Sequence, residues 1–386
     1  MSVATELQYA SIADVASLIH KGDVSPVELA QAQLDRIAAL DSRVNSYLTV
    51  TGDLALAQAR ESQEELAAGK DRGPLHGVPI ALKDLYATQG VRTTAHSKVL
   101  ETWVPDEDAT TTHLLREAGT VLLGKLAMHE FAYGGPTTDT PFPPARNPWD
   151  LAHVTGGSSS GSGAALAAGL CYGALGSDTG GSIRTPAALC GVVGLKPTYG
   201  RVSRSGVVPL SWSLDHAGPM ARTVEDCALL LQAIAGHDAK DAASSDMPVL
   251  NYTAGLSMGV AGLRVGVPRS WLAEREGTDA DVLAAFEAAL KQLERLGARI
   301  VDIDGQPFID ARQVNTLILT AEAYTYHEPT LRTHAEDIGF MLRNRLREGA
   351  FLTAADYANA MRARTVLCER INAMLASAMP SGESAS

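Results

Sequence analysis

The sequence predicts an α/β protein in which helices cover a β-sheet, and three observations support this fold class. Segments with helical spacing alternate with short apolar segments along much of the chain, as is typical of sheets that pack against helices. The 386 residues are 46% hydrophobic, which is enough to bury a large core. No internal repeat or long Gly/Ser linker divides the chain, so we expect a single domain over residues 1–386.

The amino-terminal part is predicted to be helical from its capping and turn residues. A first helix covers about 11–20, and the sequence SPVE at 25–28 is a capping box with proline in the first turn, which begins a second helix. Residues 55–69 read as a third helix. The next segment, GVPIAL at 77–82, is short, uncharged and bounded by turn residues, which indicates a buried strand.

The same alternation continues toward the carboxyl end. Helices are expected at 112–118, 223–235, about 280–296 and 354–375, and strands at 119–123, 263–267 and 298–304. Gly297 stands where the helix near 280 should be capped, just before the strand sequence ARIVDID. Residues 238–260 carry the weakest pattern, and we expect them to be an excursion within the domain.

Charge and composition exclude several classes of function. Lys and Arg total 32 against 44 Asp and Glu, a net charge of -12, and no basic run occurs, so we expect no direct binding to nucleic acid. The uncharged segment 154–177 is too rich in Gly, Ser and Thr to be a membrane helix, and MSVATELQYA does not resemble a secretory signal. A cytoplasmic location is the default expectation. The four cysteines are widely spaced and no metal-ligand motif occurs, so we expect neither a metal nor another cofactor.

The most informative stretch is TGGSSSGSGAALAAGLCYGALGSDTGGSIRTPAALCGVVGLKPTYG at 155–200. It contains two Gly-Gly-Ser turns, which end at Ser158 and Ser182. Glycine pairs allow sharp turns and close approach of a ligand, and successive N–H groups in such turns form an anion-binding nest. Because the phosphate-loop and dinucleotide patterns are absent, we expect the nest to bind a reaction oxyanion.

A serine nucleophile needs a base, and the residues alone leave two alternatives open. The pattern G-x-S-x-G at 157–161 would make Ser159 the nucleophile of a hydrolase that uses histidine as the base. The other candidate base is Lys83, which follows the apolar strand at 77–82. Burial there would lower the pKa of its ammonium by up to about 3–5 units, so that the neutral amine could accept a proton.

These motifs together resemble the amidase signature hydrolases. The resemblance is strongest over residues 77–241 and rests on PIALKD, GGSSSGS, SDTGGSIRTPA and CGVVGLKPTYGRVSR. It implies that Lys83 is the catalytic base, that Ser158 is a bridging serine on a cis peptide bond, and that Ser182 is the acyl-forming nucleophile. It also implies a large mixed sheet covered by helices on both faces.

The resemblance extends to the groups around the nucleophile. It implies that the backbone N–H groups of Thr179, Gly180, Gly181 and Ser182 form the oxyanion hole. Ser159, Asp178 and Arg184 are then expected in supporting positions. Residues 242–386 correspond to a variable region on the substrate side. After a helix such as that at 354–375, family members commonly continue into a further strand. This sequence instead ends in LASAMPSGESAS. We therefore expect the carboxyl-terminal part of the fold to be truncated.

The leading functional hypothesis is a cofactor-independent amidase that hydrolyses the C–N bond of a small-molecule carboxamide. The first alternative is the A-type component of a tRNA-dependent amidotransferase, which the sequence GVRTTAHSKVL at 90–100 also resembles and which frees ammonia from glutamine beside partner subunits. The second alternative is a truncated, non-catalytic relative that acts as a binding protein. The resemblance is compatible with a homodimer.

Overall fold

The computed structural model describes residues 6–273 and 277–378, which form two compact units. Unit 1 contains the described residues up to Thr253 together with Glu322–Gly349, and unit 2 contains those of Ala254–Ala321 and those from Ala350 onward. The long helix α11 (Gln306–Thr333) therefore contributes its first part to unit 2 and its last part to unit 1.

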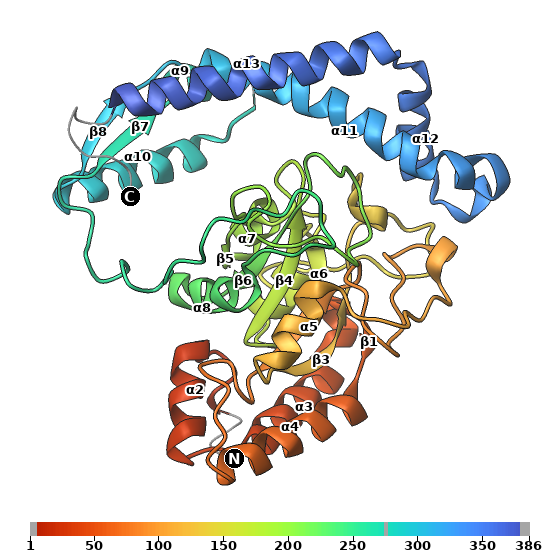
Figure 1. The fold of residues 1–386 in the computed structure, drawn as a ribbon, viewed down its shortest axis with the longest axis vertical. Helices are drawn as coiled ribbons and strands as arrows, with labels where there is room; N and C mark the ends of the chain where they lie inside the picture. Colours follow the sequence, from red (N-terminus) through yellow and green to blue (C-terminus); the bar gives the residue numbers. More distant parts are fainter. Residues whose placement is uncertain (1–5, 274–276, 379–386) are drawn as a thin grey trace. The chain divides into compact units, whose positions relative to one another are not determined.

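Unit 1 is an α/β unit built around one sheet (Figure 1). Its strands are β1 (Tyr47–Val50), β2 (Pro79–Lys83), β3 (Val121–Leu126), β4 (Gly173–Asp178), β5 (Val193–Gly194) and β6 (His216–Ala221). Its α-helices, besides the end of α11, are α2 (Ile12–Lys21), α3 (Pro26–Val44), α4 (Gly52–Ala67), α5 (Thr110–Glu117), α6 (Ser160–Ala167), α7 (Arg184–Cys190), α8 (Val224–Ile234) and α12 (Phe340–Glu348). Short 3-10 helices are η1 (Lys98–Leu100), η2 (Glu130–Ala132) and η3 (Ala335–Asp337).

The six strands form a mixed sheet in the order β1-β3-β2-β4-β6-β5. The central strand β2 pairs in parallel with β3 on one side and with β4 on the other, whereas β1, β6 and β5 pair antiparallel with their neighbours. In the register, Leu82 of β2 faces Leu175 of β4. The carboxyl ends of these two parallel strands therefore lie at the same edge of the sheet.

Helices cover both faces of this sheet, which confirms the predicted fold class. Neighbouring strand residues point to opposite faces. A Cβ on Gly173 would meet Leu230 of α8 and Ile12 of α2, so these two helices lie on that face. The next residue, Ala174, belongs to the main hydrophobic core, which also contains apolar residues of α3, α4 and α6. These three helices therefore cover the opposite face.

Most predicted elements of unit 1 are confirmed, and the capping signals act as expected. At the start of α3 the Ser25 hydroxyl accepts a hydrogen bond from the Glu28 N–H (3.1 Å), and the Glu28 carboxylate accepts one from the Ser25 N–H (2.9 Å). The strands β1, β4, β5 and β6 and the helices α7 and α12 were not predicted. The sequences of β4 and β6, GALGSD and HAGPMA, are rich in small residues and poor in β-branched ones. Their small side chains suit a sheet that is covered closely on both faces.

Unit 2 has a small sheet of its own. Strands β7 (Arg264–Val267) and β8 (Arg299–Asp302) pair in parallel, and the remaining elements are α9 (Arg269–Ala273), α10 (Ala280–Arg295), η4 (Gly349–Phe351, which begins in unit 1) and α13 (Ala354–Ala378). The predicted strand 263–267 is thus present but does not extend the main sheet. Gly297 adopts the left-handed conformation (φ +95°) expected after α10. The prediction about the tail after α13 falls on residues 379–386, which lie outside the described residues.

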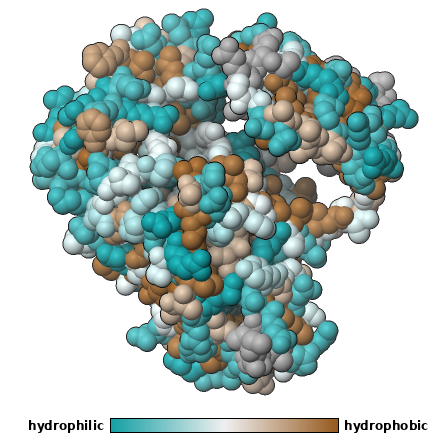
Figure 2. Space-filling model, turned by 180° about the vertical axis from the view of Figure 1, so that it is seen from behind, coloured by the Kyte–Doolittle hydropathy of each residue, from teal (hydrophilic) through white to brown (hydrophobic). Residues whose placement is uncertain are grey.

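The surface is of mixed polarity. On the side drawn in Figure 2, hydrophilic and hydrophobic residues are interspersed. Individual exposed apolar residues are normal for folded proteins. Within residues 6–273 and 277–378, no helix combines the length and apolar character needed to cross a membrane.

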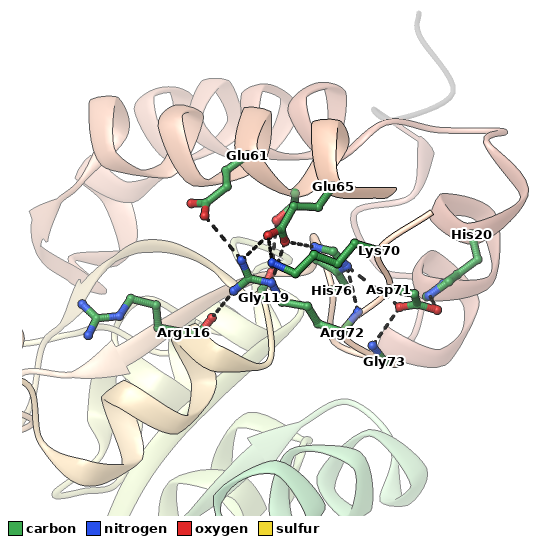
Figure 3. Close-up of polar contacts among 11 residues, drawn as sticks. His20, Glu61, Glu65, Lys70, Asp71, Arg72, Gly73, His76, Arg116 and Gly119 are labelled. Carbon is green, nitrogen blue, oxygen red and sulfur yellow. Dashed lines mark hydrogen bonds and ion pairs between the residues drawn. The ribbon is translucent and has the colours of Figure 1, made fainter. Parts of the chain in front are cut away.

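A cluster of charged side chains joins α4 to the segment that leads into β2 (Figure 3). The Arg72 guanidinium donates two hydrogen bonds of 2.6 Å to the Glu65 carboxylate, which Lys70 also contacts. The backbone N–H of Arg72 donates to Nδ1 of the buried His76 (3.2 Å), so the His76 proton lies on Nε2, which is 3.3 Å from Glu65. The hydrogen bonds from Arg72 and Lys70 lower the pKa of Glu65 from 4.5 to about 2. The cluster therefore stabilises this end of α4 only while Glu65 is ionised.

We predict that Arg72→Met lowers the melting temperature at neutral pH, because it leaves the Glu65 carboxylate with fewer donors. A carboxylate whose pKa is lowered in the folded state stabilises that state above its unfolded pKa and loses this contribution as the pH falls. The difference between wild type and variant should therefore shrink as the pH falls from 4.5 toward 2. Thermal unfolding at several pH values tests this, with Arg60→Met as control, because Arg60 is an exposed residue of α4, the helix that carries Glu65. An Arg72→Met effect that does not depend on pH would contradict the prediction.

Candidate active site

Lys83 is the last residue of β2 and is completely buried. Lys83 and Ala81 are two residues apart in β2, so their side chains point to the same face of the sheet. Ala81 belongs to the core that also contains residues of α6. The Lys83 side chain therefore starts on the α6 side of the sheet. It lies at the edge of the sheet where the parallel strands β2 and β4 both end.

The Lys83 ammonium contacts two serine hydroxyls. Its Nζ lies 2.7 Å from Oγ of Ser158 and 2.8 Å from Oγ of Ser177. Burial lowers the pKa of Lys83 from 10.5 to about 7, although the negative charges of Asp215 and Asp178 act in the opposite direction. Since a pKa near neutrality makes an amine an effective general base, Lys83 can exchange a proton with Ser158 at physiological pH.

The turn before α6 holds Ser158 against this lysine. The Gly157–Ser158 peptide bond is cis, as the family resemblance implied, and the Ser158 carbonyl accepts a hydrogen bond from the N–H of His129 (3.0 Å). The His129 ring fills the space beside Gly157, where an added Cβ would lie 2.0 Å from Cε1 of the ring. Glycine is therefore required at 157 by close packing.

The second Gly-Gly-Ser turn lies beside the first. The N–H of Ser159 donates a hydrogen bond to the carbonyl of Ser182 (3.1 Å), which joins the start of α6 to the turn before α7. Gly181 has φ +127°, a conformation that L side chains rarely adopt. Ser182 is half-buried, whereas Ser158 and Ser159 are buried. The structure thus brings together Lys83 and both Gly-Gly-Ser turns.

Asp178 and Arg184 hold the turn that carries Ser182. The Asp178 carboxylate accepts hydrogen bonds from the N–H groups of Gly181 (2.8 Å) and Ile183 (3.1 Å), and from Nε and Nη2 of Arg184 (3.0 and 2.8 Å). Burial opposes ionisation of this carboxyl, but these donors keep its pKa below its usual value. The pair therefore fixes the backbone of the turn that carries Ser182.

One of the four N–H groups expected in the oxyanion hole is already donated to a side chain of the same turn. The N–H of Gly181 is donated to the Asp178 carboxylate. The side-chain hydroxyl of Thr179 donates to Asp215 (2.5 Å). Among the described residues, the N–H groups of Gly180 and Ser182 have no hydrogen-bond acceptor. These two are therefore the most available donors for a ligand oxygen.

Ser159 does not have the surroundings of a nucleophile activated by histidine. Its Oγ accepts a hydrogen bond from the N–H of Ser177 (3.2 Å) and lies 3.4 Å from the Ser177 carbonyl. In the described part of the chain, no histidine forms a hydrogen bond with its hydroxyl. The side chain binds the end of β4 and does not cap α6. Ser159 thereby positions Ser177, which in turn contacts Lys83.

Sequence reasoning missed the importance of Ser177 and His129. Ser177 directly precedes Asp178 at the end of β4, so recognising β4 as a strand parallel to β2 would have placed its hydroxyl near Lys83. His129 lies outside the sequence motifs that predicted the site. Burial first, and then the charge of Lys83, lowers the pKa of His129 to about 4, so its ring is neutral at pH 7.

The described residues contain no cluster of three or more His, Cys, Asp or Glu side chains that could hold a metal ion. The groups that the site brings together are two serine turns, a lysine of lowered pKa and backbone N–H donors.

Comparison with known proteins agrees with this geometry. The family model described as Amidase matches residues 28–380. The chain therefore belongs to the amidase signature family, whose enzymes hydrolyse amide C–N bonds, and the predicted enzyme class is confirmed at this level.

Individual relatives define the similarity more closely. The chain is 45% identical to the A-type component of the glutamyl-tRNA(Gln) amidotransferase of Carboxydothermus hydrogenoformans, over 94% of this chain and 80% of that protein. It is 52% identical to the same component in Moorella thermoacetica, over 76% of this chain but only 60% of that protein. The crystal structure of the peptide amidase from Stenotrophomonas maltophilia superposes with a TM-score of 0.80 at 36% identity, covering 94% of this chain and 79% of that one.

We predict that Gly157→Ala lowers the rate at which a fluorophosphonate labels Ser182 by about 100-fold or more, because displacements of about 1 Å in an active site can cost that much. The added methyl would collide with the His129 ring and push Ser158 away from Lys83. Labelling rates measured by mass spectrometry test this. Gly135→Ala is the matched control, since a Cβ there meets no atom within 4 Å. Unchanged labelling of a folded Gly157→Ala variant would contradict the prediction.

Proposed function

We propose that this protein hydrolyses the C–N bond of a carboxamide through an acyl-enzyme on Ser182. The observation that carries the proposal is the buried Lys83, whose pKa is lowered to about 7 and whose Nζ lies 2.7 Å from the Ser158 hydroxyl. A serine chain that ends at a neutral amine can activate a nucleophile without histidine. Ser182 is the most accessible of the three residues to a substrate, because it is half-buried whereas Lys83 and Ser158 are buried.

The proposed proton path accounts for both halves of the reaction. Neutral Lys83 takes the proton of Ser158 as Ser158 takes that of Ser182, and the Ser182 oxygen forms a bond to the amide carbon. As the C–N bond breaks, the proton returns through Ser158 to the nitrogen, and ammonia or an amine leaves. Water then attacks the acyl ester by the same path and releases the acid. In our proposal the N–H groups of Gly180 and Ser182 stabilise the oxyanion.

The relatives favour glutamine as the amide over an unrelated small molecule. The relatives at 45% and 52% identity are both named as the A-type component of glutamyl-tRNA(Gln) amidotransferase. This supports the first alternative of the sequence analysis, in which the chain releases ammonia from glutamine beside partner subunits. The 36% identity to a peptide amidase supports the hypothesis of a free-standing amidase. Both functions would use the same chemistry at Ser182, Ser158 and Lys83, and the non-catalytic alternative has no support from the site geometry.

The partners and domain organisation belong to the same proposal. We expect a small-molecule amide as the substrate, protein partners if the chain acts within an amidotransferase, and no direct contact with nucleic acid. The family match spans both units, which supports treating residues 1–386 as one amidase domain in which 242–386 form the variable substrate side. A cytoplasmic location and a homodimer stay predictions.

The first test is Ser182→Ala, for which we expect ammonia release from glutamine to fall by at least about 1,000-fold with the fold unchanged. Ammonia is measured by a coupled assay on the protein alone and after co-purification with its partners. Activity on glutamine that appears or rises with partners supports the amidotransferase function. Hydrolysis of peptide carboxamides by the isolated protein, with none of glutamine, supports a free-standing amidase. Ser182→Ala with full activity would refute the proposed nucleophile.

The second test is the pH dependence of the rate constant for acylation. Only the neutral amine can accept a proton, so the rate should rise with pH up to about 7 and level off above it. Stopped-flow labelling by a fluorophosphonate between pH 5 and 9 measures this profile. Lys83→Met should lose the inflection and most of the rate. A wild-type rate that stays flat from pH 5 to 9 would exclude Lys83 as the titrating base.

A further inference from the structure

A cavity of about 450 Å³ lies in unit 1 at the ends of α6 and α7 that are remote from the catalytic turns. It is lined by residues of α3, by the loop 148–151, by the last turn of α6, by the turn after α7 and by Arg222. We call it the helix-end pocket. Helix α6 has eight residues and is about 12 Å long, so the pocket is distinct from the site at the start of that helix.

The charge of the helix-end pocket is opposite to that of the whole chain. Arg36, Arg43 and Arg222 line it, and no Asp or Glu does, although the chain carries a net charge of -12. Arg43 is exposed and has no hydrogen-bond or ion-pair partner among the described residues. Nε of Arg222 is buried without a hydrogen-bond partner. The carboxyl of Asp226 acts electrostatically on Arg222 but does not line the pocket, so the charged side chains of the lining are all positive.

Part of this charge has a structural explanation. Arg36 donates to the carbonyl of Ala168 at the end of α6, and Arg222 donates to the carbonyl of Cys171. Such contacts are typical of cations at helix carboxyl ends. Arg43 lies in the last turn of α3, where a cation is also favoured, but among the described residues it forms no hydrogen bond there, and Nε of Arg222 is likewise unused.

The walls supply a flat apolar surface. Trp149 is 76% exposed, yet its indole Nε1 donates a hydrogen bond of 2.8 Å to the Cys190 carbonyl, which fixes the ring at the rim. Tyr9 also lines the pocket, with the Arg36 guanidinium 5.3 Å from its ring centroid. Leu40, Leu151 and Val192 add aliphatic surface. Pockets of this size with mostly apolar walls and a few charged groups are typical of small-molecule sites.

We propose that the helix-end pocket binds a planar organic anion, with its ring system against Trp149 and its acidic group beside Arg43 and Arg222. Stacking on a fixed indole and charge-assisted hydrogen bonds from guanidinium groups are mutually compatible ways of holding such a ligand. The proposal is independent of the reaction at Ser182. It assigns a second ligand site to a chain whose catalytic site lies at the other ends of α6 and α7.

The test uses 1-naphthalenesulfonate as the anion, titrated into the full-length protein by isothermal calorimetry at low salt. We expect saturable binding that weakens at least tenfold with Arg43→Glu and with Trp149→Ala. Arg60→Glu is the matched control, because Arg60 is an exposed arginine of α4 outside the pocket, and it should leave the affinity unchanged. Arg43 is exposed, so its charge reversal keeps the test valid even if Trp149→Ala fails to fold.

Three results would overturn the proposal. One is no saturable binding of 1-naphthalenesulfonate. The second is binding that Arg43→Glu leaves unchanged, which would place the anion elsewhere, for instance at Ser182. The third is equal affinity for the neutral 1-naphthalenemethanol, which would show a merely apolar cavity.

Discussion

The burial of one amine at the end of a strand is the constraint on which the rest of the site depends. Lys83 can lie in the interior only if its Nζ has hydrogen-bond partners, and Ser158 and Ser177 supply them. Its lowered pKa follows from the same burial. The neutral amine is thus a product of the packing around β2. Ser158 and Ser177 must in turn be held in place by the residues around them.

The neighbouring structure supplies this support through a few close contacts. The His129 ring packs where Gly157 lacks a side chain, and the N–H of His129 fixes the Ser158 carbonyl. Ser159 binds the backbone of Ser177, and its own N–H binds the carbonyl of Ser182. Rigid mutual support of this kind keeps catalytic groups in productive positions. The glycines and serines of the motif are therefore required by packing as much as by chemistry.

The sequence allowed much of this to be predicted, and the limits have physical reasons. Capping signals and apolar spacing predicted helices α2, α3, α4, α5 and α8, and the motif resemblance implied that Lys83, Ser158 and Ser182 share one site. Strand β4 was missed because its small residues have low β-propensity, and with it the position of Ser177. The separate sheet of β7 and β8 was missed because alternation of helix and strand does not reveal which strands pair. That Gly181 donates its N–H to Asp178 depends on side-chain geometry that no pattern encodes.

The discontinuity of unit 1 bears on how the protein folds as it is synthesised. Residues 322–349 belong to unit 1, but they leave the ribosome only after residues 254–321 of unit 2. Two buried carboxylates depend on this late segment, since Glu322 accepts from Ser211 and Ser213, and Glu130 accepts from the N–H of Gly339. Contacts so distant in sequence are slow to form. The loop next to His129 therefore acquires its final partner late, and the catalytic unit completes its fold only after much of the second unit has emerged.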